Sequence, residues 1–419
     1  MDTLLEMLFN EERWLSAIHK AYDKDIRKDQ LYQLTKPEIR ASLYAAIKSG
    51  KYRIAPPHTA KIPKDSPGEF RTVYVNEPID RVLLSMMNDI LFETMPEKIH
   101  PCCRSYLKGT GCGKVVQEVS RQVISTPGDV IGWKSDLSKY FDSVPLRYID
   151  SALDSIEEKF GKSAFVKVLR DYYHCDLYFD EQGTLQESYQ SLKQGCAVAA
   201  WLADVILYEV DEKLSRMGYY QRYSDDQLFL GENWEQALQT VKDMLAGMDM
   251  TINPKKMELL HPDRWFKFLG FSIRGKDITL SHSRIKAFQK EIESRTIRNR
   301  DASPEKATRD VVRFLYKGNG RHAWATQVLP ICNVLRDIST LNAFVMDCLR
   351  AKQTGKDKLG GLGYNPEGRD GCIVRGRGRN VSANREKTPG RIEGYLTLGC
   401  MRKALLTCRN AYDTLTANL

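Results

Sequence analysis

Helical periodicity dominates the first 55 residues, and four prolines between positions 56 and 67 interrupt it. The alternating residues of KIPKDSPGEFRTVYVN predict a β-hairpin that turns at Ser66-Pro67-Gly68. Apolar residues spaced three and four apart then predict a helix from Ile79 to Phe92 and further helical structure between Tyr148 and Tyr173.

The middle of the chain alternates between strand-like and helix-like stretches. DVIGWKSDLSKYFDSV predicts a strand that ends at Asp136, and SLKQGCAVAAWLADVILYEVDEKL begins as a loop and predicts one long apolar helix. A strand pair around YSDD, a helix with apolar positions from Trp234 to Met248 and one short strand, FKFLGFSI, follow. This order predicts an α+β layer, with helices covering one face of an antiparallel sheet.

The last third of the chain returns to a helical pattern. RIKAFQKEIESR places Ile285, Phe288 and Ile292 on one face of a helix. Residues 351–395 contain ten glycines and carry a net charge of +5, which predicts a loop-rich segment without a core of its own. A final amphipathic helix is expected between Leu398 and Leu415.

Composition is that of an ordinary globular protein, because 42% of the 419 residues are hydrophobic and 28% are charged. The N-terminus lacks the pattern of a secretory signal, and the longest nearly apolar stretch, AVAAWLADVIL, is too short to span a bilayer. We therefore expect a cytoplasmic protein without membrane contact. Ten cysteines are then expected to be free, and a zinc cluster is the alternative for four residues that lack paired CxxC spacing, namely His100, Cys102, Cys103 and Cys112.

The positive charge is regional. Residues 281–395 hold 23 Lys and Arg against 12 Asp and Glu, a net +11, so the remainder of the chain carries −2 of the total +9. A concentrated basic region favours a polyanionic partner such as nucleic acid, and a solvated basic surface is the alternative.

Three aspartates carry the candidate chemistry. Asp136 closes a predicted strand, and Asp225 and Asp226 lie at the tip of the hairpin predicted around YSDD. If these strands are neighbours, three carboxylates meet in one volume and repel one another unless cations are present. Two Mg²⁺ ions about 3.5 to 4 Å apart would suit an in-line phosphoryl displacement. The alternative is that the paired acids serve only as turn residues.

Taken in order, KSDLSKYFDSV, LKQGCAVAAWLADV, RYSDDQLFLG, MTINPKKMEL and FKFLGFSI resemble the palm motifs of reverse transcriptases, particularly bacterial enzymes related to group II intron proteins. KIPKDSPGEFRTVYVNEPIDRVL resembles their fingers hairpin, so the likeness covers about residues 55–300. It implies an RNA-directed DNA polymerase with a right-hand fold. The implied parts are N-terminal helices and fingers (1–130), an antiparallel palm (131–280, with fingers/palm helices between 150 and 190), a helical thumb (281–350), and a basic Gly-rich segment with a C-terminal helix (351–419).

The same resemblance implies a role for each matching residue. Asp136 and Asp225 correspond to the metal-binding aspartates, Asp226 to a more peripheral third ligand, and Leu137 to a backbone carbonyl ligand of the second Mg²⁺, for which Mn²⁺ is an alternative. Phe141 matches the aromatic gate that rejects a 2′-OH. The implied nucleotide-binding residues are Lys64, Arg71, Gln194, Gly195 and Lys256. Phe268, Leu269 and Gly270 match the primer grip, and the expected nucleic-acid contacts are Arg284, Lys286, Arg375, Arg377 and Arg379. Tyr316, Trp324 and Tyr364 are further candidates for stacking on bases, with Trp324 alternatively a core residue.

The subfamily is inferred from the positions at which this sequence departs from the motifs of intron-type enzymes. The QG motif continues as CAVAAWLADV rather than a Ser-Pro-rich segment, Ser224 fills the variable position of YxDD, and no HNH-like cluster is evident. By elimination the chain is most similar to defence-associated bacterial reverse transcriptases, which implies deoxynucleotides, a primer and a structured non-coding RNA as partners. Untemplated or protein-primed synthesis, a group II intron-like or retron-like enzyme, and a metal-dependent nuclease remain alternatives. The oligomeric state is left open.

Overall fold

The computed structural model describes residues 2–22, 28–63, 68–107, 109–316 and 323–355. The chain divides into two compact units, one formed by Met1–Gly111 and Thr126–Leu260 and the other by Cys112–Ser125 and His261–Leu419. Each unit is described by itself. The finer division into fingers, palm, thumb and basic tail stays a prediction.

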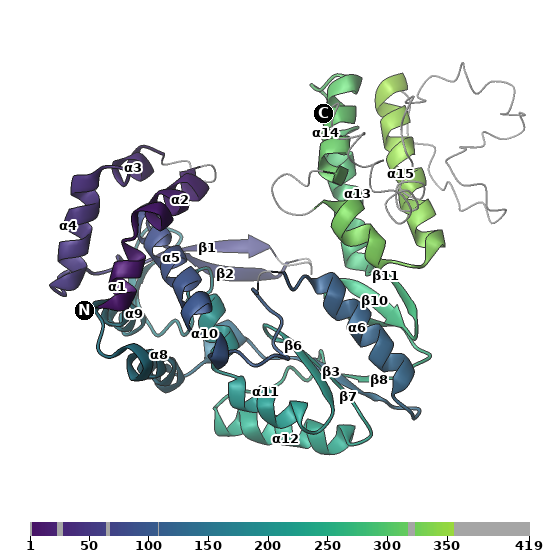
Figure 1. Cartoon of the computed structure of the whole chain (residues 1–419). Helices are drawn as coiled ribbons and strands as arrows, with labels where there is room; N and C mark the ends of the chain where they lie inside the picture. The colour runs from purple at the N-terminus through teal and green to yellow at the C-terminus, as the bar shows by residue number, and fades with distance from the viewer. Residues whose placement is uncertain (1, 23–27, 64–67, 108, 317–322, 356–419) are drawn as a thin grey trace, which may run out of the picture. The chain divides into compact units, whose positions relative to one another are not determined.

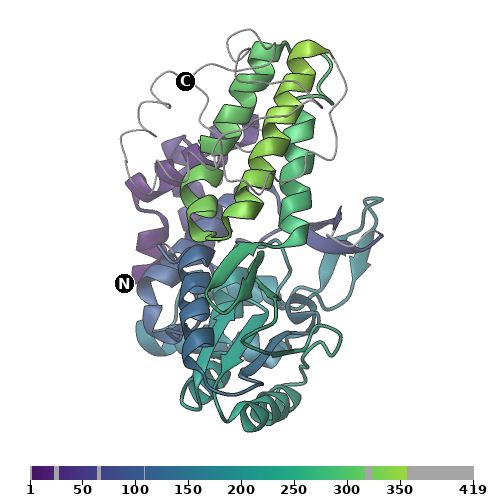
Figure 2. The same ribbon diagram turned by 90° about the vertical axis from the view of Figure 1, so that its right-hand side faces the viewer.

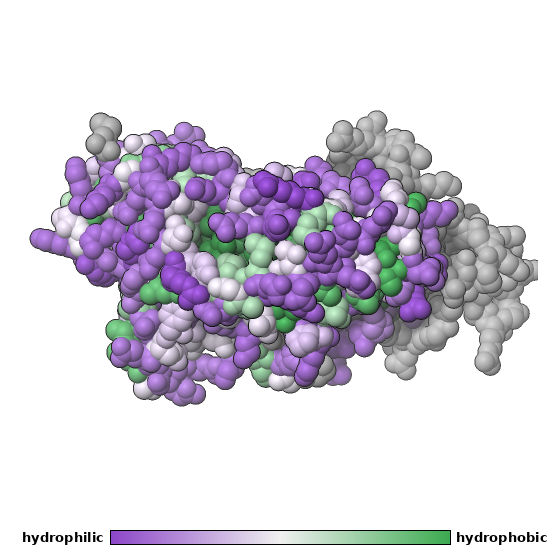
Figure 3. Space-filling view, turned by 90° about the horizontal axis from the view of Figure 1, so that it is seen from below, coloured by the Kyte–Doolittle hydropathy of each residue, from purple (hydrophilic) through white to green (hydrophobic). Residues whose placement is uncertain are grey.

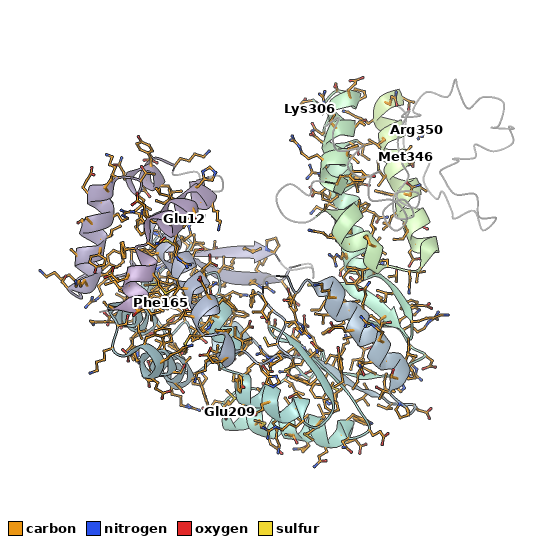
Figure 4. All side chains as sticks on the ribbon, in the orientation of Figure 1. Glu12, Phe165, Glu209, Lys306, Met346 and Arg350 are labelled. Atoms are coloured by element: carbon orange, nitrogen blue, oxygen red, sulfur yellow. The ribbon has the colours of Figure 1, made fainter. Side chains whose placement is uncertain are left out.

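The first unit begins with short helices gathered around a long one. α1 (Thr3–Leu8), α2 (Glu11–Tyr22) and α3 (Lys28–Gln33) pack against α5 (Pro78–Thr94), while α4 (Pro37–Lys48) packs against α9 (Ala164–Tyr173). Figure 1 shows this group of helices in purple and blue. Trp14 is buried and donates its indole N–H to the Leu34 carbonyl at 2.8 Å, which joins α2 to the segment after α3. Phe165 of α9, labelled in Figure 4, is fully buried in the same core.

Two sheets follow in this unit. The predicted hairpin is confirmed as β1 (His58–Pro63) and β2 (Phe70–Val75), whose turn residues 64–67 lie outside the described ranges. β4 (Leu177–Phe179) and β5 (Leu185–Glu187) extend this sheet in the order β2-β1-β4-β5. The second sheet has the order β6-β7-β3-β8 and is fully antiparallel, with β6 (Tyr219–Tyr223), β7 (Asp226–Leu230), β3 (Gly132–Asp136) and β8 (Glu258–Leu260).

Helices cover the β6-β7-β3-β8 sheet as expected for an α+β layer. α11 (Tyr208–Ser215) contacts β6, and α12 (Trp234–Gly247) contacts β3 and β7. Figure 1 shows these two helices along the sheet. The rings of Trp133 and Phe229 stack at 5.9 Å on neighbouring strands and fill the core between sheet and helices. α7 (Tyr140–Ser143), α8 (Leu146–Phe160), the 3₁₀ turn η1 (Pro96–Lys98) and α10 (Ala199–Val205) complete the unit.

The prediction of one long helix after the QG loop is wrong. The chain forms two helices, α10 and α11, separated by Ile206 and Leu207. The physical reason is competition for carbonyl groups near the end of α10. Tyr140 and Arg222 donate to the Ala203 carbonyl at 2.8 and 3.1 Å, and Arg222 also donates to the Asp204 carbonyl at 2.8 Å. These side chains satisfy acceptors that a continuous helix would pair internally.

The second unit combines a small sheet with helices. β9 (Phe266–Phe268), β10 (Phe271–Arg274) and β11 (Asp277–Leu280) form a three-stranded antiparallel sheet that contacts α6 (Cys112–Ser125). α13 (His282–Arg295), α14 (Pro304–Tyr316) and α15 (Leu335–Thr354) lie side by side, as Figures 1 and 2 show. The π turn η3 (Trp324–Val328) and the 3₁₀ turn η4 (Leu329–Ile331) link α14 to α15.

The prediction that FKFLGFSI is one strand is also wrong. β9 and β10 form a hairpin in which Phe268 pairs with Phe271, and Leu269 and Gly270 make the turn. Both turn residues have positive φ, +48° for Leu269 and +79° for Gly270, the backbone that suits a two-residue hairpin turn. The apolar run concealed this turn because Leu is an unusual residue at such a position.

The described surface is largely polar. Figure 3 shows one face on which hydrophilic residues predominate and apolar residues form separate patches. Helices in the described ranges lack the combination of length and apolarity needed to cross a bilayer.

Candidate active site

The three predicted aspartates meet at one end of the β6-β7-β3-β8 sheet. β6 and β7 are joined by a two-residue turn, Ser224 and Asp225, and Ser224 adopts a left-handed φ of +60°. The register between β3 and β7 places Asp136 directly opposite Asp226. Residue Leu137 continues past β3 and donates its N–H to the Asp225 carbonyl at 3.0 Å. The sheet therefore joins acids from two distant segments of the chain.

The loop before β8 supports Asp136 from the other side. Asn253 donates its N–H to the Asp136 carbonyl at 2.7 Å, and Ser138 donates to the Thr251 carbonyl at 2.8 Å. The Lys256 ammonium reaches the Asp136 carboxylate, with 2.5 Å between Nζ and Oδ2. Asp136 is only 8% exposed, whereas the Lys256 side chain is 60% exposed, so this counter-charge comes from the solvent side.

Electrostatics at this end of the sheet are unfavourable to negative charge. Burial, then the charges of Asp225 and Asp136, raise the pKa of Asp226 to about 6. Burial and the Asp136 charge likewise raise the pKa of Asp225, and the Lys256 and Arg71 cations oppose that rise. Burial alone would lower the pKa of Lys256, but its hydrogen bond to Asp136 and the charges of the three carboxylates raise it. The charge of Asp136 thus makes the ionisation of Asp225 and Asp226 more costly, and Asp225 adds to this effect at Asp226.

The donor set suits a hard cation, since three carboxylates that repel one another would bind Mg²⁺ or Mn²⁺ through oxygen. The charge crowding at Asp225 and Asp226 is the observation that carries this fit. As they stand, the side chains in the described ranges contain no group of three or more His, Cys, Asp or Glu arranged to hold a metal ion. Lys256 holds one oxygen of Asp136, Oδ2, in this arrangement, so a cation that bound through that oxygen would displace the ammonium.

A second charged cluster lies behind the aspartate turn and was not anticipated from the sequence. Arg222, the residue two before Ser224, is completely buried. Its guanidinium grips Asp211 in a bidentate pair, Nε to Oδ1 at 2.7 Å and Nη2 to Oδ2 at 2.6 Å, and donates to the Ser224 carbonyl at 3.2 Å. Burial raises the pKa of Asp204 to about 6, although nearby Arg222 lowers it. The signal in the sequence was an acid at 204 inside the otherwise apolar helix AAWLADV, together with an arginine in the strand YYQRY.

The predicted nucleotide-binding residues that lie in described ranges share this unit. Arg71 is exposed on β2, and Phe141 is half-buried with its ring edge-on to Tyr140 at 5.7 Å. The Phe141 carbonyl accepts an N–H from Leu192 at 3.1 Å, which links the gate candidate to the loop that carries Gln194. Leu137 is buried, and Lys64 lies outside the described ranges. Their roles stay predictions.

The QG loop is fastened to β2 by a close backbone approach. Tyr74 donates its N–H to the Gln194 carbonyl at 2.7 Å. Gly195 has φ +109°, and a Cβ there would lie 2.9 Å from the Tyr74 carbonyl oxygen. Only glycine fits this position without displacing the strand.

Lys193 anchors the same loop from within and was also missed. It is 1% exposed, and its ammonium donates to the Tyr172 and Cys175 carbonyls at 2.7 and 2.6 Å, beside the end of α9. The ammonium also lies 4.3 Å from the centroid of the Tyr172 ring. Burial lowers the pKa of Lys193 to about 8. A lysine next to an expected nucleotide loop would be assigned to phosphate, but this one is structural.

The remaining predicted residues belong to the second unit. Phe268 is buried, and Leu269 and Gly270 form the β9–β10 turn. The Arg284 guanidinium lies over the rings of Phe271 and Trp324, at 4.6 and 5.5 Å from their centroids, and burial lowers its pKa. Trp324 and Tyr316 are buried, whereas Lys286 is exposed. Positions outside the described ranges are Tyr364, Arg375, Arg377 and Arg379.

The cysteine cluster shows no metal-site geometry in the described ranges. Cys102 and Cys103 are buried and free, and Cys112 is free and partly buried. His100 Nδ1 lies 3.0 Å from Cys102 Sγ, and burial raises the pKa of the Cys103 thiol to about 12. These thiols pack as small apolar groups.

Comparison with known proteins identifies a family for the chain. A family model described as "Reverse transcriptase (RNA-dependent DNA polymerase)" matches residues 62–273, just over half of the chain. A curated protein from Saccharomyces cerevisiae, "Putative COX1/OXI3 intron 1 protein", is 24% identical over 166 residues, which are 40% of this chain. The match spans only 19% of that protein's length.

Two solved telomerase structures align with the chain at low sequence identity. Telomerase from Candida albicans, solved with a fragment of telomeric RNA, aligns with a TM-score of 0.41 and 10% identity, covering 76% of this chain and 64% of that one. Apo telomerase from Candida tropicalis aligns with a TM-score of 0.43 and 12% identity, covering 71% and 57%. The family match confirms the predicted right-hand polymerase fold and the enzyme class.

Proposed function

Because the chain belongs to the reverse transcriptase family, we propose that it adds deoxynucleotides to a primer on an RNA template at the Asp136, Asp225 and Asp226 cluster. The observation that carries the proposal is the β3–β7 register, which sets Asp136 opposite Asp226 and next to the turn residue Asp225. An acidic end of a sheet, in which Asp136 and Asp225 raise the pKa of Asp226, is suited to transferring a phosphoryl group with cations present.

Asp136, Asp225 and Asp226 would hold two divalent ions, Mg²⁺ or Mn²⁺, with the Leu137 carbonyl as a further ligand. When bound, such ions neutralise charge on the phosphates and activate the attacking oxygen. The chain's own residues supply the rest of the site. Lys256 holds an Asp136 oxygen and becomes available to the departing pyrophosphate once that oxygen is taken.

Arg71 and Phe141 would select the incoming nucleotide. Arg71 acts electrostatically on Asp225, so its guanidinium lies within reach of the same end of the sheet and is suited to binding a triphosphate. Phe141 follows β3 by five residues and presents a half-buried ring. A ring beside the sugar would exclude the 2′-OH of ribonucleotides, so we expect Phe141→Ala to accept both sugars in a competition assay.

The test is primer extension on a defined RNA. Purified protein, a primed RNA, Mg²⁺ and deoxynucleotides should give extended DNA, and Asp225→Ala with Asp226→Ala should abolish extension while retaining the wild-type circular dichroism spectrum. Shortening of the nucleic acid would instead indicate a nuclease. Extension without a template would indicate terminal addition or protein priming.

For the biological setting, we propose a cytoplasmic bacterial enzyme that copies a dedicated structured non-coding RNA in defence against phage. The basis is elimination: the chain departs from intron enzymes after its QG motif, and its net positive charge is concentrated in residues 281–395. An intron-like retroelement enzyme is the second candidate, because the curated relative is an intron protein.

Sequencing the nucleic acid that co-purifies with the protein separates the two settings. One abundant folded RNA, together with its DNA copy, would favour the defence setting. Intron RNA from the protein's own locus would favour the second.

A further inference from the structure

Ser224 is the first residue of the turn that carries Asp225, and its N–H, its carbonyl and its hydroxyl each have a hydrogen-bond partner. Its N–H donates to Ser105 Oγ at 3.0 Å, its carbonyl accepts from Arg222 at 3.2 Å, and its hydroxyl lies 3.1 Å from the Tyr106 hydroxyl. Ser105 and Tyr106 are adjacent in the chain and more than a hundred residues from the turn. None of the motifs that identified the site includes them.

The segment that carries these two residues is itself fixed against β6. Arg222 donates its N–H to the Cys102 carbonyl at 3.0 Å, and Arg104 donates to the Arg222 carbonyl at 2.9 Å. Cys103 pairs with Arg222 as a parallel bridge. Ser105 is fully buried and donates its hydroxyl to Asp204 Oδ1 at 2.6 Å. These hydrogen bonds hold Ser105 in place, so its hydroxyl oxygen is already positioned to accept the Ser224 N–H.

Tyr106 makes its contact from a strained and open position. Its φ is +56°, a left-handed backbone that is uncommon for a tyrosine, and 46% of the residue is exposed. Its hydroxyl nevertheless points at Ser224 rather than at water. A half-exposed ring contributes little to the core, so the contact matters chiefly for where the turn sits.

We propose that Ser105 and Tyr106 are positioning residues that set the catalytic turn by holding Ser224, the residue bonded to Asp225. This inference rests on the proposed polymerase function. Neither residue is among the expected nucleotide-binding residues, so their loss should change how often Asp225 is correctly placed and leave nucleotide binding as it is. The expected signature is a lower kcat with an unchanged KM for deoxynucleotides.

A double-mutant cycle tests the Tyr106–Ser224 contact. Tyr106→Phe removes one hydroxyl and Ser224→Ala removes the other, and each should lower kcat for primer extension about fivefold, the value of one hydrogen bond. Because each variant breaks the same contact, the double variant should fall by the same factor as either one. Tyr44→Phe is the matched control, since Tyr44 gives its hydroxyl to Glu6 on α1 and should extend primers at the wild-type rate.

The outcomes separate the two levels of the proposal. A wild-type protein that extends no primer overturns the proposed function. A wild-type protein that does extend, with Tyr106→Phe equally fast, or with losses that multiply in the double variant, overturns the positioning role alone. A Tyr106→Phe protein with a lowered melting temperature and a raised KM would also overturn it, because that pattern marks a general loss of structure.

Discussion

Two clusters of aspartates lie near the β6–β7 hairpin, and their negative charge is balanced in different ways. Asp204 and Asp211 are fully buried around Arg222, which is also fully buried and makes hydrogen bonds with all three of its guanidinium nitrogens. In the cluster of Asp136, Asp225 and Asp226, the ion pair found within the described ranges joins Lys256 to Asp136, and the Lys256 side chain is mostly exposed.

The difference identifies which cluster belongs to the scaffold. A buried carboxylate is tolerated when a fixed cation and good hydrogen bonds accompany it. The Arg222 cluster meets that condition within the protein. The Asp136 cluster does not, because its paired cation, Lys256, is an exposed side chain. Burial raises the pKa of a carboxyl in both clusters, to about 6 for Asp226 and for Asp204, so the fixed cation is what separates them. A site whose charge is balanced from outside is the one that can bind and release ions with its substrate.

Arg222→Met should have the largest effect on stability. The methionine fills much of the same space but leaves Asp204 and Asp211 buried without a cation, which we expect to cost about 3–5 kcal/mol of the free energy of unfolding. Urea denaturation at pH 7.5 measures it. The loss should shrink at acidic pH, because the stranded carboxyls can then be protonated.

Arg216→Met is the matched control for that experiment. Arg216 forms an exposed pair with Glu212 one helical turn away, so its removal should change stability by less than about 0.5 kcal/mol. Equal losses for the two variants would mean that Arg222 is not the compensating charge of the buried cluster.

Asp226→Asn should have an intermediate effect, and of the opposite sign. With a pKa of about 6, folded Asp226 binds its proton more tightly than the unfolded chain does, so stability falls as pH rises through about 6. The amide cannot ionise, and without divalent ions the variant should be more stable than wild type by about 1 kcal/mol at pH 7.5, after allowance for solvent screening. The gain should vanish near pH 4.

Urea midpoints at the two pH values measure the Asp226 effect, with the exposed Asp243→Asn on α12 as control. A variant that is less stable than wild type at pH 7.5 would show that Asp226 is compensated within the protein.

Lys256→Met should have the smallest effect on stability. The Lys256–Asp136 pair involves an exposed ammonium, so its loss should cost less than about 1 kcal/mol and still less in high salt. Urea denaturation in low and high salt checks this. A loss as large as that of Arg222→Met would contradict the comparison between the clusters.

Local patterning was sufficient for many of the elements, and it placed the aspartates at strand ends that converge if the strands are neighbours. Strand patterning placed Asp136 at the end of β3 and the acid pair at the β6–β7 turn, and these positions depend on local periodicity. The roles of Arg222, Asp204 and Ser105 were not predicted, because their hydrogen-bond partners lie on other segments of the chain. Their polar side chains look like exceptions in apolar segments until the facing element is known.

The two element errors have the same origin. The break between α10 and α11 arises where Tyr140 and Arg222 take helix carbonyls, and the β9–β10 turn places a leucine at positive φ. In each case a contact or a register outweighs the local preference of the chain. Roles in the second unit depend on its placement against a nucleic acid, which periodicity does not encode.

The contact between Gly195 and Tyr74 has a mechanical consequence. With its carbonyl accepting from Tyr74 and the next residue pressed on the same strand, Gln194 cannot shift independently of β2, the strand that bears Arg71. A displacement of the β1–β2 hairpin would therefore move the Arg71 and Gln194 side chains together.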